Sequence, residues 1–215
     1  MMKTRYFLYS LLAVITLTMT SCGDDDEKVK TAPAPDATGT WTDDRDQTEY
    51  GWVRYGNLEW TTENLRFKPA EGVTLPSLTP VNPSYYNDGV AAKYYETFGF
   101  LYDHEAALAA VPEGWRLPTN SDWADLEARC GGDIKGAVKL LLGGYQRNDD
   151  YAQQIHGIDY YTYEYGYYWS ADIDESKPEE NFAYYRKLVY NQAGSTQSSM
   201  DKTNYLSVRL VRDAQ

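Results

Sequence analysis

The stretch Gly114-Trp115-Arg116-Leu117-Pro118-Thr119-Asn120-Ser121-Asp122-Trp123 is the most tightly specified part of the chain. Pro118 disfavours helical geometry in Leu117, which predicts an extended segment before the proline. Thr119 and Asp122 stand three residues apart, the spacing at which two side chains can cap the free backbone N–H groups of a first helical turn. The stretch therefore predicts an extended segment that passes directly into a helix.

The residues that follow continue this helix with one apolar face. Trp123, Leu126 and Cys130 lie at positions i, i+3 and i+7, which places them on one side of a helix and predicts their burial. Two glycines at 131 and 132 then end it. Helices are expected over residues 104–110, 120–130 and 134 to about 142, with Asp103, Thr119 and Asp133 as their N-caps.

Strands are expected on both sides of these helices. Gly56-Asn57 is a turn dipeptide, which predicts a hairpin of residues 50–55 and 58–62. Leu206, Val208 and Leu210 alternate with other residues, which predicts a half-buried strand. The further strands are expected over residues 98–102, 167–171, 183–190 and 205–211. Four prolines between residues 68 and 88 predict a long loop there.

The first 21 residues have the features of a lipoprotein signal peptide. Lys3 and Arg5 precede an apolar stretch that is shorter than the roughly 20 residues needed to span a bilayer. Small residues then lead to Cys22, the expected site of lipidation. The alternative is an ordinary secretory cleavage site beside a chance cysteine.

The segment after Cys22 is acidic and rich in proline. Such a composition cannot form a core, so residues 22–40 are expected to be a disordered tether and residues 41–215 the globular domain. An acidic run directly after the lipidated cysteine resembles the surface-export signal of Bacteroidota lipoproteins. It predicts an outer-membrane protein that faces the extracellular side, and a spacer that faces the periplasm is the alternative.

The overall composition limits the partners and the cross-links. A net charge of −12 without a basic cluster makes nucleic acid a poor partner. Of the two cysteines only Cys130 remains once Cys22 is lipidated, so no intramolecular disulfide is expected.

Few residues suggest chemistry. Cys130 lies on the predicted buried helix face, where a thiol is inert. His104 begins a predicted helix, where a capping or solvated role is expected, and His156 belongs to no metal-ligand spacing. No common catalytic motif occurs, so neither a catalytic residue nor a cofactor is expected.

Carboxylates at positions i and i+2 of a loop can turn toward one hard cation, which suggests a calcium site. The weak candidate ligands are Asp172, Asp174 and Glu175. A solvated loop is the favoured alternative.

Tyrosine is unusually frequent, with 21 in the chain. Tyr161, Tyr163 and Tyr165 alternate in a polar run and are expected to line one exposed face, with Tyr160 beside them. Tyrosine offers large, rigid contact area with a hydroxyl, which suits the stacking of sugar rings or of an extended peptide. The alternative is that these tyrosines pack a loop-rich domain with their hydroxyls at the surface.

Several motifs in a fixed order resemble one family. They are Arg45-Asp46, Tyr50, Val53, Gly56-Asn57, Trp60, Glu63-Asn64-Leu65, Gly99-Phe100-Leu101-Tyr102, Glu105-Ala106-Ala107, the stretch from Pro112 to Thr119, Asp122-Trp123, Tyr168-Trp169-Ser170 and Ser207-Val208-Arg209. Over residues 43–212 this order resembles the Fibrobacter succinogenes major paralogous domain. The resemblance implies a fold signature of Trp60, Asn64, Trp115, Arg116, Pro118, Thr119, Trp123, Trp169 and Arg209.

That family is similar to the C-type-lectin-like superfamily, and the motif around Arg116 also resembles formylglycine-generating enzymes of that fold. The implied fold class is α+β: a small twisted antiparallel sheet with two main helices and long loops. Formylglycine-generating catalysis needs reactive cysteines, which the C-terminal region lacks. The family usually has cysteines where this chain has Val111 and Leu210, which suggests that they pair in relatives, so these two side chains are predicted to pack together.

The expected function is that of a lipid-anchored, surface-exposed binding or adhesin-like lipoprotein that recognises a glycan or a protein. Its contact with the membrane is expected through the lipid anchor only. The alternative is a structural or assembly component of a surface complex, such as a fimbrial tip or an accessory to polysaccharide uptake. An unrecognised enzyme is a third hypothesis.

Overall fold

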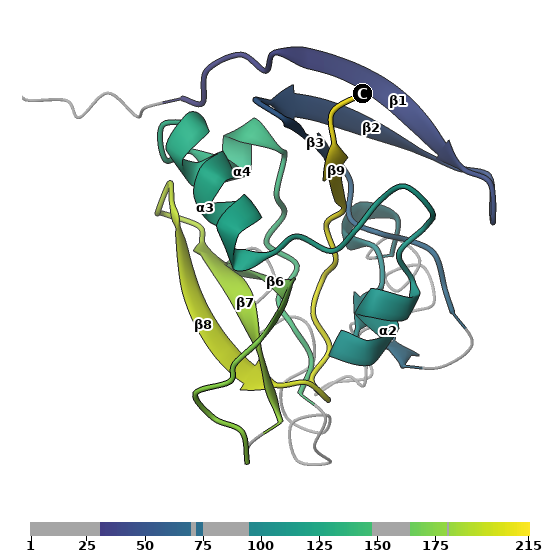
Figure 1. Ribbon diagram of the computed structural model, residues 1–215, viewed down its shortest axis with the longest axis vertical. Coiled ribbons are helices and arrows are strands. Elements are labelled where there is room, and N and C mark those ends of the chain that lie inside the picture. Colours follow the sequence, from purple (N-terminus) through teal and green to yellow (C-terminus); the bar gives the residue numbers. More distant parts are fainter. Residues whose placement is uncertain (1–30, 70–71, 75–94, 148–163, 180) are drawn as a thin grey trace, which may run out of the picture.

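The computed structural model describes residues 31–69, 72–74, 95–147, 164–179 and 181–215 (Figure 1). These residues form a mixed α/β structure with antiparallel sheets and few helices, which agrees with the predicted α+β class. No helix among them is long and apolar enough to cross a membrane.

The first sheet has four antiparallel strands in the order β1-β2-β3-β9. Their bounds are β1 Ala37–Asp43, β2 Thr48–Tyr55, β3 Leu58–Thr61 and β9 Val211–Asp213. The predicted hairpin is confirmed: Tyr55 pairs with Leu58 across the turn, in which Gly56 takes a φ of 63°. A positive φ costs glycine little, which explains why it stands there.

The prediction of a tether as far as residue 40 is wrong at its C-terminal end. β1 begins at Ala37, and residues 31–36 already contact the domain. The backbone N–H of Ala32 donates to Asp133 at 3.1 Å, and the hydroxyl of Tyr55 donates to the carbonyl of Pro33 at 2.9 Å. Composition suggested disorder because the segment is acidic, rich in proline and low in hydrophobicity, but β2 and Asp133 supply hydrogen-bond partners for these residues.

The second sheet has three antiparallel strands in the order β6-β7-β8. Their bounds are β6 Tyr165–Ile173, β7 Phe182–Val189 and β8 Ser195–Asp201. The first two were predicted, whereas β8 was missed because its polar sequence has no apolar alternation. A two-stranded ribbon of β4 (Val73–Thr74) and β5 (Leu101–Tyr102) replaces the longer strand expected over residues 98–102.

The bounds of the helices are α2 His104–Ala109, α3 Asn120–Arg129 and α4 Ile134–Ala137. The N-caps Asp103, Thr119 and Asp133 are confirmed, and Thr119 and Asp122 form the predicted capping box. α4 is much shorter than expected. Lys139 takes a left-handed φ of 52°, so the chain leaves the helix before the predicted end at residue 142.

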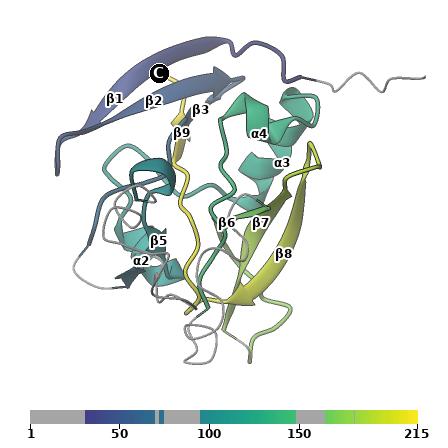
Figure 2. The same ribbon diagram turned by 180° about the vertical axis from the view of Figure 1, so that it is seen from behind.

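The expected strand over residues 205–211 is also wrong. Residues 206–210 instead run between the two sheets as a buried connection, and regular pairing begins only with β9 (Figures 1 and 2). Leu206 pairs singly with Tyr102 and Ser207 with Tyr168. The segment is enclosed by two different partners rather than one neighbouring strand, a fact that its own alternation could not reveal.

The core has two clusters of buried side chains. One surrounds Trp169 and contains Leu210, and Val111 packs against the same cluster. Direct contact between Val111 and Leu210 stays a prediction. The other surrounds Trp60 and Trp123, whose ring centres lie 4.8 Å apart, and includes Cys130 on the predicted face of α3.

Candidate functional site

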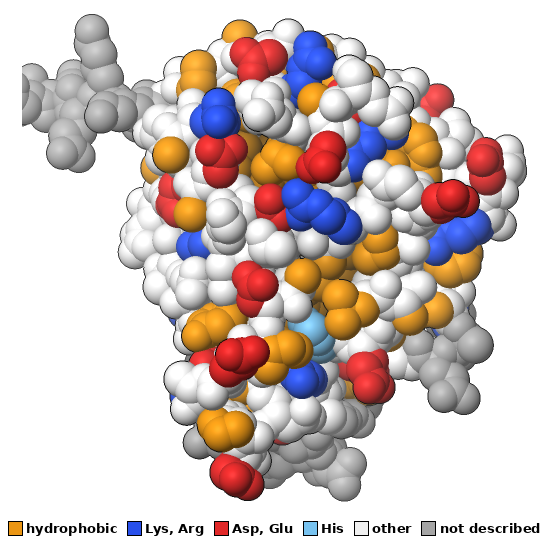
Figure 3. Space-filling view, in the orientation of Figure 1, with side chains coloured by type: hydrophobic (Ala, Val, Ile, Leu, Met, Phe, Trp, Pro, Cys, Tyr) orange, Lys and Arg blue, Asp and Glu red, His pale blue; other side chains and the backbone are white. Residues whose placement is uncertain are grey.

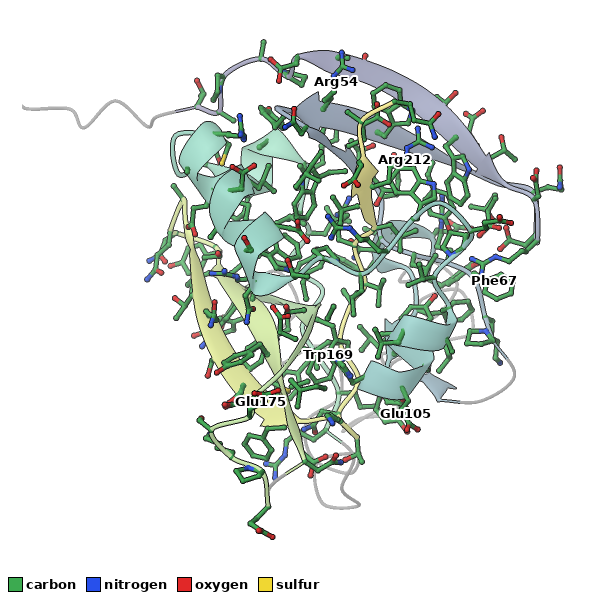
Figure 4. The ribbon with its side chains drawn as sticks, viewed as in Figure 1. Arg54, Phe67, Glu105, Trp169, Glu175 and Arg212 are labelled. Atoms are coloured by element: carbon green, nitrogen blue, oxygen red, sulfur yellow. The ribbon has the colours of Figure 1, made fainter. Side chains whose placement is uncertain are left out.

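The residues of the fold signature lie mostly in the interior. Trp60, Trp123, Trp169 and Arg209 are fully buried, and Trp115 is 6% exposed. The indole N–H of Trp169 on β6 donates to the carbonyl of Tyr102 on β5 at 2.8 Å. Figure 4 shows the Trp169 side chain between β6 and α2. Asn64 and Pro118 are buried as well. These side chains therefore build the scaffold and are not available to a ligand.

Arg116 and Asp122 join the opening segment to α3. The Arg116 guanidinium forms a salt bridge with Asp122, with a second contact of 3.0 Å between Nη2 and Oδ1. Burial opposes ionisation of Asp122, but hydrogen bonds from Arg116 and Thr119 outweigh it and lower the pKa of this carboxyl. The pair is a structural clamp, since the same carboxylate also caps the helix through the N–H of Thr119.

The two residues considered for chemistry have structural roles. The Cys130 thiol is fully buried, and burial raises its pKa, which makes it inert. His104 begins α2 as expected, but the expectation of a solvated side chain is wrong. It is 1% exposed, its Nε2 lies 2.9 Å from the carbonyl oxygen of Ser170, and burial lowers its pKa. His156 lies outside the described residues.

The three carboxylates of the calcium candidate do not converge. Asp172 accepts the backbone N–H of Asn120 at 2.6 Å, whereas Asp174 accepts from the hydroxyls of Ser176, Ser199 and Tyr184. Glu175 is exposed on the turn after β6 (Figure 4). Within the described part of the chain no group of three or more potential ligands could hold a metal ion.

Of the predicted tyrosine surface only Tyr165 can be placed, because Tyr160, Tyr161 and Tyr163 lie outside the described residues. Tyr165 begins β6, and its ring centre lies 6.3 Å from that of Tyr167. The Lys187 ammonium stands 4.4 Å above the Tyr165 ring. Tyr145 and Tyr185 flank Tyr167 at 4.6 Å and 5.7 Å, so this residue belongs to a packed aromatic group.

A second aromatic surface lies on the first sheet and was not predicted. We call it the tryptophan face. It consists of Trp41 on β1, Trp52 on β2, Arg212 on β9, and Trp115 in the segment before α3. The ring centres of Trp41 and Trp115 lie 5.3 Å apart. The guanidinium carbon of Arg212 lies 4.4 Å from the ring centre of Trp115 and 5.8 Å from that of Trp52. Figure 4 shows Arg212 beneath the arch of β1 and β2.

Strand register explains how these side chains meet. Trp41 lies opposite Tyr50, Gly39 opposite Trp52, and Glu59 opposite Arg212, so the pleat directs these residues to one side of the sheet. Trp41 stacks on the buried Tyr50 ring at 5.5 Å. Trp41 and Trp52 are both half-buried, which leaves part of each indole accessible on a rigid support.

The Trp52 side chain lies across β1 at Gly39. A Cβ atom at position 39 would come within 2.4 Å of the Trp52 ring, so only glycine leaves room for the indole there. The indole N–H then donates to the backbone carbonyl of Thr40 at 3.2 Å. This contact fixes the orientation of Trp52 and covers part of the strand.

The charge on the tryptophan face is balanced. Arg212 Nε lies 2.7 Å from Glu59 Oε2, and the Glu59 side chain is only 3% exposed. Acidic and basic side chains are interspersed over the side of the molecule shown in Figure 3. The pairing with Glu59 therefore leaves Arg212 without an uncompensated charge on the tryptophan face.

A comparison with protein families finds a match in the middle of the chain. Residues 53–155 match the family model of the Fibrobacter succinogenes major domain. The chain carries a Fibrobacter succinogenes major domain. Three of the four residues of the tryptophan face, Trp41, Trp52 and Arg212, lie outside the part that matches this domain. No curated protein and no solved structure matches the chain.

The sequence offered only a weak signal for the tryptophan face. Trp52 was placed correctly in a strand, but β1 was not predicted, so the position of Trp41 opposite Tyr50 could not be foreseen. Arg212 follows the predicted strand over residues 205–211 and joins the face only because β9 pairs with β3.

Proposed function

We propose that this protein is a lipid-anchored binding lipoprotein of the outer membrane that faces the extracellular side and recognises a glycan or a protein. The observation that carries the proposal is the tryptophan face. Trp41 and Trp52 keep part of their rings accessible, although both are anchored on a rigid antiparallel sheet. Rigid aromatic side chains provide contact area at a low cost in conformational entropy, which is the property that enriches them in recognition surfaces.

Binding is proposed rather than catalysis because the residues with the greatest chemical potential are committed elsewhere. Cys130 and His104 are buried, and Asp122 caps a helix while it pairs with Arg116. None of them faces the tryptophan face or the groove of about 490 Å³ that lies between β2 and residues 32–35. We further propose that the α+β domain has a C-type-lectin-like architecture.

The sequence that precedes Cys22 supports the proposed lipidation and location. The sequence from Lys3 to Cys22 has the charge, the apolar stretch and the small residues of a lipoprotein signal. Acyl chains contribute about 0.8 kcal/mol for each buried methylene group, so more than one chain gives a stable attachment without a spanning helix.

The test is an adhesion and pull-down assay with the full chain displayed on cells. Trp52→Ala removes a partly accessible indole. The carbonyl of Thr40 then loses the indole N–H as its donor, but water can replace that donor at the surface, so the fold is expected to persist. We expect a loss of at least tenfold in binding to the captured ligand or surface. Phe182→Ala on β7 is the matched control, because Phe182 is half-buried and also carries a cation over its ring, Lys177 at 4.6 Å.

Unchanged binding by Trp52→Ala would reject the tryptophan face as the contact surface and favour the tyrosine group around Tyr165. A partner that co-purifies equally with both variants, without any adhesion to glycan or cells, would favour the assembly component over the binding protein.

A further inference from the structure

We propose that the tryptophan face binds the flat face of a neutral sugar ring, and this inference rests on the function proposed above. The partly accessible indoles of Trp41 and Trp52 lie on this surface, and the Arg212 guanidinium lies near Trp52 and near the almost buried Trp115. The face of an aromatic ring carries partial negative charge, and the C–H groups on one side of a sugar ring carry partial positive charge. Their stacking needs a flat apolar surface with hydrogen-bond donors nearby, and the tryptophan face provides both.

The ion pair of Arg212 argues against an anionic ligand. The carboxylate of Glu59 lies 2.7 Å from Arg212 Nε and already neutralises the guanidinium. An anionic ligand at the remaining N–H groups would lie close to this carboxylate, and the repulsion between the two anions would offset its attraction to Arg212.

A cationic ligand is disfavoured for a different reason. The attraction of a cation to an indole depends on access to the ring face. The Arg212 guanidinium already lies 4.4 Å from the Trp115 ring centre and 5.8 Å from that of Trp52, and it would repel a second cation. A neutral ligand avoids both penalties.

Hydrogen-bond donors are available for the hydroxyl groups of such a ligand. Arg212 uses its Nε–H for Glu59, and a guanidinium has four further N–H donors.

The experiment is a glycan array probed with the full chain in detergent micelles, followed by titration of intrinsic tryptophan fluorescence with maltodextrin, mannan and cello-oligosaccharides. We expect signals on neutral glycans, a fluorescence change with at least one neutral saccharide, and a loss of at least tenfold in apparent affinity for Trp52→Ala. Phe182→Ala should bind as the unchanged protein does. Polygalacturonate is the anionic comparison and should not bind more tightly than the neutral saccharides.

Two results would overturn the inference. One is the absence of any neutral-glycan signal, and the other is neutral-glycan binding that Trp52→Ala leaves unchanged. If Trp52→Ala loses adhesion or a protein partner while no saccharide binds, the proposed binding function stands and only the sugar is wrong. Circular dichroism of each variant separates loss of the site from loss of the fold.

Discussion

Arg209 is a buried cation that has no carboxylate partner among the described residues. Its guanidinium is fully buried and donates to the carbonyl of Thr61 at 2.9 Å, to the side-chain oxygen of Asn64 at 2.7 Å and to the carbonyl of Lys139 at 3.2 Å. Burial lowers its pKa. Thr61 and Asn64 lie at the end of β3 and just after it, whereas Lys139 follows α4, so this one side chain ties the first sheet to the chain after α4. Its planar fork of donors suits the task in a way that one ammonium group cannot.

Arg209→Lys is therefore expected to be strongly destabilising despite the conserved charge. A lysine leaves at least one buried acceptor unpaired and a poorly solvated cation, so the free energy of unfolding should fall by about 3–5 kcal/mol. Urea denaturation followed by tryptophan fluorescence measures this change. Arg54→Lys on β2, where the side chain is half-buried, is the control and should change stability by less than about 0.5 kcal/mol.

Asp174 fastens the three strands of the second sheet at one end. Hydrogen bonds from Ser176, Ser199 and Tyr184 stabilise its charged form and lower its pKa to about 2. A carboxyl with a lowered pKa contributes stability above its unfolded pKa, near about 4, and loses that contribution as the pH falls toward its folded pKa.

Asp174→Asn should lower the melting temperature at neutral pH, since the amide cannot accept all three hydrogen bonds as an anion does. The difference from the unchanged protein should shrink as the pH falls from about 4 to about 2, because protonation then removes the charge of Asp174, which the asparagine variant lacks at every pH. Thermal unfolding across this range is the measurement. A difference that stays constant with pH would contradict the assignment.

At the level of elements, local signals were reliable and non-local ones were not. Gly56-Asn57 and the Thr119–Asp122 pair specify a turn and a helix start by chemistry within a few residues, and both are confirmed. β8 depends instead on β7 as its neighbour, since its own Ser and Gln residues have no strand pattern. The end of α4 is set by the left-handed Lys139, whose carbonyl bonds to the distant Arg209.

β1 is an edge strand, and its backbone direction follows from the neighbouring strand. Gly51 donates its N–H to Glu63 at 2.8 Å and accepts from the N–H of Thr62 at 2.8 Å, so both of its backbone groups point toward β3. Opposite residues of an antiparallel pair either exchange both bonds or none, and Thr40 lies opposite Gly51. The carbonyl of Thr40 therefore points to the open edge, where Trp52 covers it.

Gly39→Ala should displace Trp52 from this position, because the new methyl group would lie 2.4 Å from the indole. Crowding of this kind costs about 1–3 kcal/mol. The edge of β1 would also be uncovered, which favours association between chains. Thermal unfolding and light scattering test both effects, and Thr42→Ala, an exposed position on the same strand, should change neither.

The candidate site could be predicted less well than the fold because its residues are distant in sequence. The tryptophan face combines β1, β2, the segment before α3 and β9, so it depends on the completed sheet. The tyrosine group was easier to suspect because its residues cluster along the chain. Only Tyr165 of the four predicted residues can be placed, and this surface remains a prediction.

The whole domain should depend on residues that composition assigned to the tether. A chain that begins at residue 41 loses half of β1 and the bonds of Ala32, Pro33 and Asp36 to the body of the domain. Three such hydrogen bonds, each contributing about 0.5–1.5 kcal/mol, predict a loss of about 2–4 kcal/mol. Chemical denaturation of chains beginning at residues 31 and 41 gives the comparison. Equal stability would show that the N-terminal contacts are unimportant.

The docking of residues 31–36 also sets how far the domain can travel from its proposed anchor. Only eight residues separate Cys22 from Thr31, and the nine residue-to-residue steps reach at most roughly 30 Å even when fully extended. A free tether as far as residue 40 would have doubled that radius. The short linker would therefore keep the domain close to the membrane surface, and a ligand would have to approach that surface to be bound.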